Sequence, residues 1–273
     1  MARKTILIIL LITVLPLFVN CSDGKTKQLN IVIDFDDTDN NYTRHYTDIT
    51  RCLKGAFKII EERLDISTSV ELRVNVKFPE ANNLSCASVE FSRTGSNGTV
   101  NIYEQGAAAV LKNPEAFADS AYHIVLNVGT NRLNTLWFDP APEERTAEIP
   151  EGSYSDAVSI MLHELIHAFA LNGWLDSSTG NSTSPNGTLS TYDVNVINDN
   201  GTLYFAGENA VAQYGGPIPL SFNNYKHYGN EEPGPGSDLA GYVMFGFFYS
   251  WRYRFYLSEL DVAILKDSGM PVK

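Results

Sequence analysis

The stretch HELIHAFALNG, residues 163–173, limits the fold of this chain more than any other part of its sequence. It lies in residues 157–171, which contain no Gly or Pro and tolerate a helix throughout. Upstream, residues 153–156 (SYSD) have the spacing of a capping box, which begins helices. We therefore predict a helix over residues 157–171. Residues four apart in a helix share a face, so His163 and His167 should point the same way.

The two histidines and the glutamate that follows the first of them predict a zinc site. Zinc binds imidazole nitrogens at ~2.0–2.1 Å in a tetrahedral arrangement, and a helical spacing of four supplies two ligands without bending the backbone. Glu164 is placed to act as a general base toward a water molecule that zinc has acidified. The competing interpretation is an ordinary buried helix whose histidines form hydrogen bonds within the core.

A third ligand must come from elsewhere, because the position six residues after His167 is Gly173. The chain contains five histidines, and His227 alone follows the motif, in an Asn-rich and loop-like stretch. His45, in a predicted helix, and His123, in a predicted strand, precede the motif. We therefore predict His227 as the third zinc ligand.

Glu208 is the second choice for this ligand. A glutamate on a following helix completes some catalytic zinc sites, and Glu208 begins a segment of helix-forming residues. It stands further from His167 than such a glutamate usually does. We therefore rank it after His227.

Composition restricts the class of protein and its partners. A chain of 273 residues with 44% hydrophobic content can bury one sizeable core, or form two subdomains that share a cleft. The formal net charge of −12 argues against binding to nucleic acid or to an anionic membrane surface, because both would repel the chain. We expect the chain to be a monomer.

The N-terminus resembles a secretory signal. Arg3 and Lys4 precede an apolar run over residues 6–19, which is short for a membrane span. We predict residues 1–21 as a signal peptide. Cys21 is then either lipid-modified or removed, so the protein is either a cell-surface lipoprotein or secreted into the extracellular space. Any membrane attachment would be through a lipid anchor at Cys21.

Export also bears on the other two cysteines. In an oxidising compartment Cys52 and Cys86 are the natural disulfide pair. The alternative is two unpaired thiols buried in the core.

The pattern of apolar residues predicts a mixed α+β fold. The first half should be a sheet with a helix packed across it, and the second half is rich in Ser, Thr, Asn and Gly, which indicates long loops. The predicted strands are residues 29–35, 70–78, 87–91, 100–103 and 121–128, the first helix covers 43–64, and the long loops cover 173–204 and 229–237.

Several segments together resemble the metzincin clan of zinc endopeptidases, and within it the leishmanolysin-like group. That group also has a long insertion between HExxH and its third histidine. The matching segments are GENAVA at 207–212, PIPL at 217–220, LAGYVM at 239–244 and the closing segment at 257–270, where Ser258 is an expected N-cap.

The resemblance implies a zincin-like fold and a zinc endopeptidase activity on a peptide or protein substrate. It implies an N-terminal catalytic subdomain over residues 29–172 and a C-terminal subdomain over 173–273, which carries the third ligand, a terminal helix and a Met-turn with Met244 beneath the zinc. It also implies that substrate lies along an edge strand, either residues 121–128 or the stretch ending at Phe138. The alternative is a relative that keeps the fold but is an inactive binding or adhesion protein.

The end of the zinc-binding helix departs from the family pattern. Metzincins usually carry Gly three residues after the second histidine, where this chain has Ala170. We therefore expect the helix to continue for up to one more turn. Gly173 would then end it in the left-handed conformation.

Overall fold

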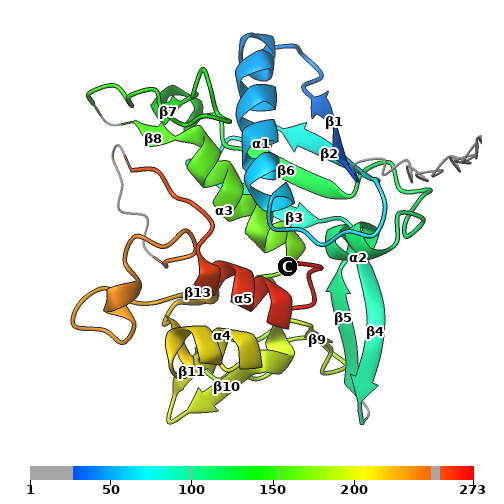
Figure 1. Cartoon of the computed structure of the whole chain (residues 1–273), viewed down its shortest axis with the longest axis vertical. Coiled ribbons are helices and arrows are strands. Elements are labelled where there is room, and N and C mark those ends of the chain that lie inside the picture. Colours follow the sequence, from blue (N-terminus) through cyan, green and yellow to red (C-terminus); the bar gives the residue numbers. More distant parts are fainter. Residues whose placement is uncertain (1–26, 99, 153, 247–252) are drawn as a thin grey trace, which may run out of the picture.

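The computed structural model describes residues 27–98, 100–152, 154–246 and 253–273 (Figure 1). The predicted signal peptide, residues 1–21 with Cys21, lies outside the described residues. Within the described part of the chain, no helix is long and apolar enough to cross a membrane. This part has an α+β fold, with five α-helices and several separate sheets.

The first sheet lies in the N-terminal half and has the strand order β1-β2-β6-β3. Its first three strands are parallel, and β3 is antiparallel to β6. Strand β2 alternates apolar and polar residues, and its apolar set, Val70, Leu72, Val74 and Val76, is buried. The strands are β1 (Leu29–Asp36), β2 (Val70–Lys77), β3 (Leu84–Ser88) and β6 (Ile124–Val128).

Two helices pack on this sheet, as Figure 1 shows. Helix α1 (Tyr46–Glu61) follows a short 3-10 turn, η1 (Thr43–His45), and buries an apolar stripe at three- and four-residue spacing. Helix α3 (Ala157–Phe169) packs against both α1 and β3. Its sides are buried almost all round, so it is a central helix of the core.

The edge of this sheet is not where we predicted it. The strand expected at residues 121–128 is β6, which pairs with β2 on one side and β3 on the other. The stretch ending at Phe138 contributes only β7 (Leu136–Trp137), which pairs with β8 (Ser155–Asp156). The outer strand beside α3 is β3, which the sequence pattern placed three residues too late.

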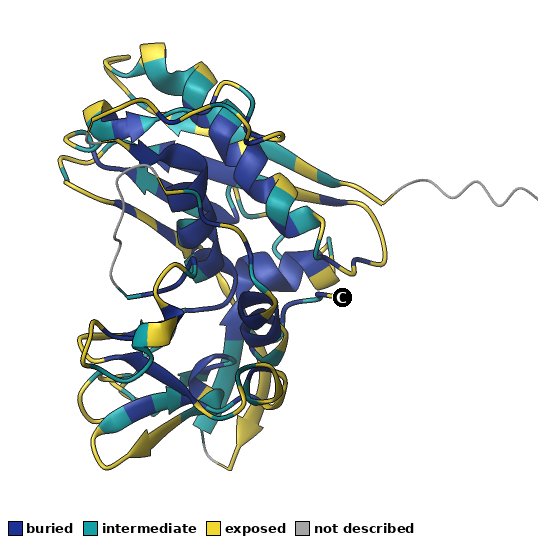
Figure 2. Ribbon diagram, turned by 60° about the vertical axis from the view of Figure 1, so that its left-hand side comes forward, coloured by how far each residue is buried: buried dark blue, intermediate teal, exposed yellow. Residues whose placement is uncertain are grey.

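A hairpin follows β3. It consists of β4 (Phe91–Asn97) and β5 (Val100–Gln105), and β5 also pairs with the short β9 (Leu189–Ser190). Helix α2 (Gly106–Lys112) leads the chain from the hairpin toward β6. Strand β4 is mostly exposed, in contrast to the buried centre of the molecule (Figure 2).

The C-terminal half contains a second sheet that the sequence pattern did not predict. Its antiparallel strands are consecutive in the chain, in the order β10-β11-β12-β13. Helix α4 packs against α5, and Ser258 caps α5 through a capping box, as predicted. The elements are β10 (Val196–Asp199), β11 (Thr202–Phe205), β12 (Ile218–Ser221), β13 (Asn224–Tyr228), α4 (Glu208–Tyr214) and α5 (Glu259–Asp267), with the 3-10 turns η2 (Leu133–Thr135), η3 (Asp193–Asn195) and η4 (Ser237–Leu239).

Residues of both halves belong to one hydrophobic core. The subdomain boundary between residues 172 and 173 therefore remains a prediction from the sequence.

The predicted disulfide is not formed, because Cys52 and Cys86 are both free and buried. The Cys52 thiol lies on α1 with its sulfur 3.8 Å from the backbone oxygen of Asp139. Cys86 lies on β3 near Glu164, in a different environment. Burial raises the pKa of the Cys52 thiol to about 12 and that of Cys86 well above its usual value. The second interpretation, two buried thiols, describes the structure.

Candidate metal centre

Helix α3 begins and ends close to the predicted positions. Asp156 is its N-cap, and its carboxylate accepts a hydrogen bond from the Ser159 N–H. The helix ends at Phe169, and Ala170 already has non-helical angles. The prediction of an extra turn is therefore wrong.

Gly173 has a different role from the helix stop that we predicted. Its φ is outside the left-handed region, so it does not end the helix in that conformation. A β-carbon at this position would lie 2.0 Å from Oδ1 of Asp193, closer than any real contact. Glycine is needed here because the buried Asp193 carboxylate approaches the backbone.

The three predicted histidines meet at one point. Nε2 of His227 lies 3.1 Å from Nε2 of both His163 and His167, and the last two atoms are 3.2 Å apart. Zinc with Zn–N bonds of ~2.0–2.1 Å has tetrahedral edges of about 3.3–3.4 Å. The three nitrogens therefore have nearly the spacing of one face of a zinc tetrahedron.

Hydrogen bonds on the opposite side of two rings fix their tautomers. Nδ1 of His163 lies 2.6 Å from the carbonyl oxygen of Val243, and Nδ1 of His167 lies 2.8 Å from that of Leu171. A carbonyl oxygen only accepts, so each Nδ1 carries the hydrogen and each Nε2 of the neutral ring carries a lone pair. Both Nε2 lone pairs are then directed at the same point as His227.

Burial keeps these rings neutral. It lowers the pKa of His163 to about 4, and burial together with the neighbouring His163 lowers the pKa of His227 to about 3. The pKa of His167 is lowered in the same direction, mainly by burial and further by the other two rings. Close-set neutral imidazoles with unprotonated nitrogens repel one another, and a divalent cation between them is the arrangement that such donors favour.

Glu164 lies beside this group in a hollow of about 380 Å³. The hollow is bounded by the three histidines, by β3 at residues 84–86 and by β13 near Lys226. Burial raises the pKa of the Glu164 carboxyl to about 8, and a hydrogen bond from the Cys86 backbone N–H acts against that rise. A carboxyl group that titrates near neutral pH can exchange protons with a reacting group.

Met244 is fully buried in a turn over residues 242–245. Its carbonyl accepts a hydrogen bond from the N–H of Tyr228, and the carbonyl of the preceding Val243 binds His163. The turn therefore connects the strand of the third histidine to the ring of the first.

The other candidates do not join the histidine group. Glu208 is an exposed residue at the start of α4, outside the cluster that the described residues form. His123 precedes β6 and lies beside Arg73, and His45 lies in η1 against Phe138. His227 is in strand β13 and not in the loop that we predicted.

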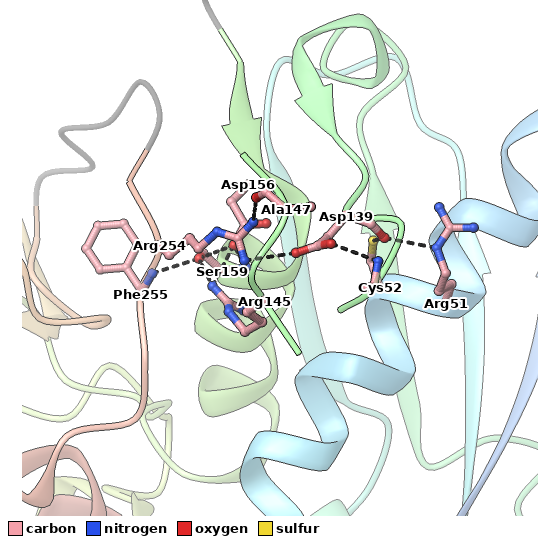
Figure 3. Close-up of polar contacts among 10 residues, drawn as sticks. Arg51, Cys52, Asp139, Arg145, Ala147, Asp156, Ser159, Arg254 and Phe255 are labelled. Carbon is pink, nitrogen blue, oxygen red and sulfur yellow. Dashed lines mark hydrogen bonds and ion pairs between the residues drawn. The ribbon is translucent and has the colours of Figure 1, made fainter. Parts of the chain in front are cut away.

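The opposite end of α3 carries a different polar cluster, which Figure 3 shows. The buried Arg145 pairs with Asp156 at 2.7 Å and also donates to Ser159. Nearby, Arg254 pairs with the buried Asp139 at 3.0 Å. Opposite charges neutralise each other here, so this cluster has the composition of a structural ion-pair network.

The supporting groups had weak signals in the sequence or none. The carbonyls of Val243 and Leu171 and the N–H of Cys86 belong to the backbone, which is the same at every position. Asp193 could have been noticed only as an acidic residue within a polar segment.

Comparison of the chain with protein-family models, with curated proteins and with solved structures found no match.

Proposed function

We propose that this protein is an exported zinc endopeptidase with a metzincin-like fold. The observation that carries the proposal is the convergence of three Nε2 atoms, 3.1–3.2 Å apart, with a glutamate beside them in the same hollow. The antiparallel edge strand β3, the helix α3 and the buried turn at Met244 support the relationship to metzincins. Export rests on the sequence of residues 1–21 alone.

The chemistry follows from the positions of these side chains. When bound by His163, His167 and His227, zinc supplies a Lewis acid that acidifies water and polarises a carbonyl group. Glu164 accepts a proton from the attacking water, whose oxygen forms a bond to the scissile carbonyl carbon. The same carboxyl then gives that proton to the leaving amine nitrogen as the C–N bond breaks.

Strand β3 offers a surface for the substrate backbone. In the ladder with β6, Asn83 and Val89 direct backbone groups toward β6, so residues 84, 86 and 88 direct theirs away from β6, where the Cys86 N–H meets Glu164. This edge of β3 borders the hollow that contains Glu164. An extended peptide could therefore pair with β3 and place one of its carbonyls at the metal centre.

The test is metal analysis and peptidase assay of the wild type and of Glu164→Gln. Both should hold one zinc per chain, since Glu164 is not a ligand. Cleavage of an unfolded protein substrate should fall about 10²–10⁴-fold in the variant, the usual contribution of general acid-base catalysis. Glu208→Gln, an exposed glutamate outside the cluster, is the matched control and should cleave normally.

Two outcomes would contradict the proposal. A wild type that holds zinc but cleaves nothing would favour the alternative, a binding or adhesion protein that keeps the metal. A wild type without stoichiometric zinc would remove the metal centre altogether.

A further inference from the structure

The third histidine is held differently from the other two. Nδ1 of His163 and Nδ1 of His167 each bind a backbone carbonyl. Nδ1 of His227 faces the backbone of Asn224 but forms no hydrogen bond of normal geometry within the described residues. The position of His227 must therefore come mainly from how its strand, β13, is fastened.

Tyr225 fastens this strand two residues before the ligand. Its ring is buried, and its hydroxyl donates to Oδ1 of Asp193 at 2.8 Å and accepts from the N–H of Leu175 at 2.9 Å. Its carbonyl oxygen accepts a hydrogen bond from the hydroxyl of Tyr192 at 2.7 Å. Only Lys226 separates Tyr225 from His227 in β13, so fixing the backbone at Tyr225 restrains the position of His227.

The carboxylate of Asp193 holds the chain that leaves the zinc-binding helix. Its Oδ2 accepts the N–H of Trp174 at 2.9 Å and the N–H of Ser190 at 2.8 Å. Trp174 follows Leu171, whose carbonyl fixes the ring of His167. One buried carboxylate therefore connects the loop after His167 to the strand that carries His227.

The absence of a side chain at Gly173 makes this connection close. Any β-carbon there would overlap the Asp193 carboxylate, so the loop can lie directly on it. Compact zinc sites carry their third ligand at the position of Gly173. In this chain the glycine leaves room for Asp193, which helps to position the distant ligand His227.

We propose that Asp193, acting through Tyr225, is the positioning residue that sets His227 against the His163–His167 pair and so determines zinc affinity. The inference rests on the proposed zinc site. Neither residue contacts the metal position; each acts through the strand or the loop that carries a ligand.

Tyr225→Phe tests the link, because it removes one hydroxyl and keeps the buried ring. Zinc affinity, measured by competition with a chromophoric chelator, should weaken about 10–100-fold, the usual effect of losing a group that orients a ligand. The visible absorption of the Co²⁺-loaded protein should change as well, because it reports ligand geometry. Circular dichroism of the metal-free variant should remain that of the folded wild type.

Asp193→Asn provides a second, independent variant. The amide oxygen can still accept from Trp174 and Ser190, while its NH₂ group faces a tyrosine hydroxyl that already accepts from Leu175. Zinc affinity should fall by a similar factor. The double variant should be little worse than either single one, because both substitutions break one connection.

Tyr228→Phe is the matched control. Tyr228 is also buried on β13, but its hydroxyl binds Asp261 on α5. This variant keeps both the backbone bond from Tyr228 to Met244 and the link to the His167 loop, so it should lose stability yet keep zinc affinity within about threefold of the wild type.

If the wild type binds zinc and both Tyr225→Phe and Asp193→Asn bind it equally well, this inference is overturned while the proposed metal centre stands. An equal loss of zinc affinity in Tyr228→Phe would also overturn it, because removing any buried hydroxyl from β13 would then have the same effect. A wild type that binds no zinc would overturn the proposed metal centre, and this inference with it.

Discussion

The two ends of α3 both bury polar side chains, but they satisfy them in opposite ways. At the N-terminal end, Arg145 meets Asp156 and the charges cancel within the protein. In the C-terminal half, His163 and His167 meet a third histidine, and three ring nitrogens converge on one point.

This difference separates a structural cluster from a site for a ligand. A buried ion pair contains its own counter-charge, so it needs no added ion to balance its charge. Three neutral bases directed at one point are complementary to a cation that the chain does not supply. Both ends of α3 are buried and polar, so these two properties do not distinguish a structural cluster from a ligand site. The distinguishing feature is whether the groups that meet carry opposite charges or are all bases.

The comparison predicts its largest effect at the histidine end. His227→Ala should weaken zinc binding by more than about 100-fold, since a ligand contributes more than the groups that orient it. Glu208→Ala should leave zinc binding unchanged. Equilibrium dialysis with metal analysis measures both. Full zinc retention by His227→Ala, or loss of zinc from Glu208→Ala, would give the third position to another residue.

A smaller effect, and one on stability, is expected at the other end. Asp156→Ala leaves the Arg145 guanidinium buried without its counter-charge and removes the N-cap of α3. The free energy of unfolding should fall by about 3–5 kcal/mol, as when one partner of a buried pair is lost. Denaturant unfolding measures this change in the metal-free protein.

The same variant tests whether the two ends are independent. Zinc affinity of the folded Asp156→Ala protein should stay within about threefold of the wild type. A loss of more than tenfold with the fold intact would show that the ion-pair end also sets the geometry of the histidines, and the comparison would then fail.

The sequence predicted the parts of this fold that rest on local chemistry. The period of apolar residues located α1 and α3, and the spacing of four identified His163 and His167 as neighbours. Residues 196–204 were predicted as part of a loop because of their polar composition, although Asn200-Gly201 is a strong hairpin signal. Both residues have positive φ in the turn between β10 and β11, which begins the second sheet.

The parts that could not be predicted depend on contacts distant in the chain. The position of His227 near the helix follows from how β13 is fastened, through Tyr225 and Asp193, and no local pattern encodes those contacts. The free thiols of Cys52 and Cys86 likewise follow from their different neighbours, since Cys52 lies beside the Asp139 carbonyl and Cys86 lies near Glu164. Counting residue types identified the third histidine, but only the fold shows what holds it in place.

The central claim is that three imidazoles form a zinc site. X-ray absorption spectroscopy of the zinc-loaded wild type tests it most directly, because the spectrum reports the elements around the metal and their distances. We expect three imidazole nitrogens at ~2.0–2.1 Å. A sulfur ligand at ~2.3 Å, which would implicate Cys86, or fewer than three imidazoles would contradict the account.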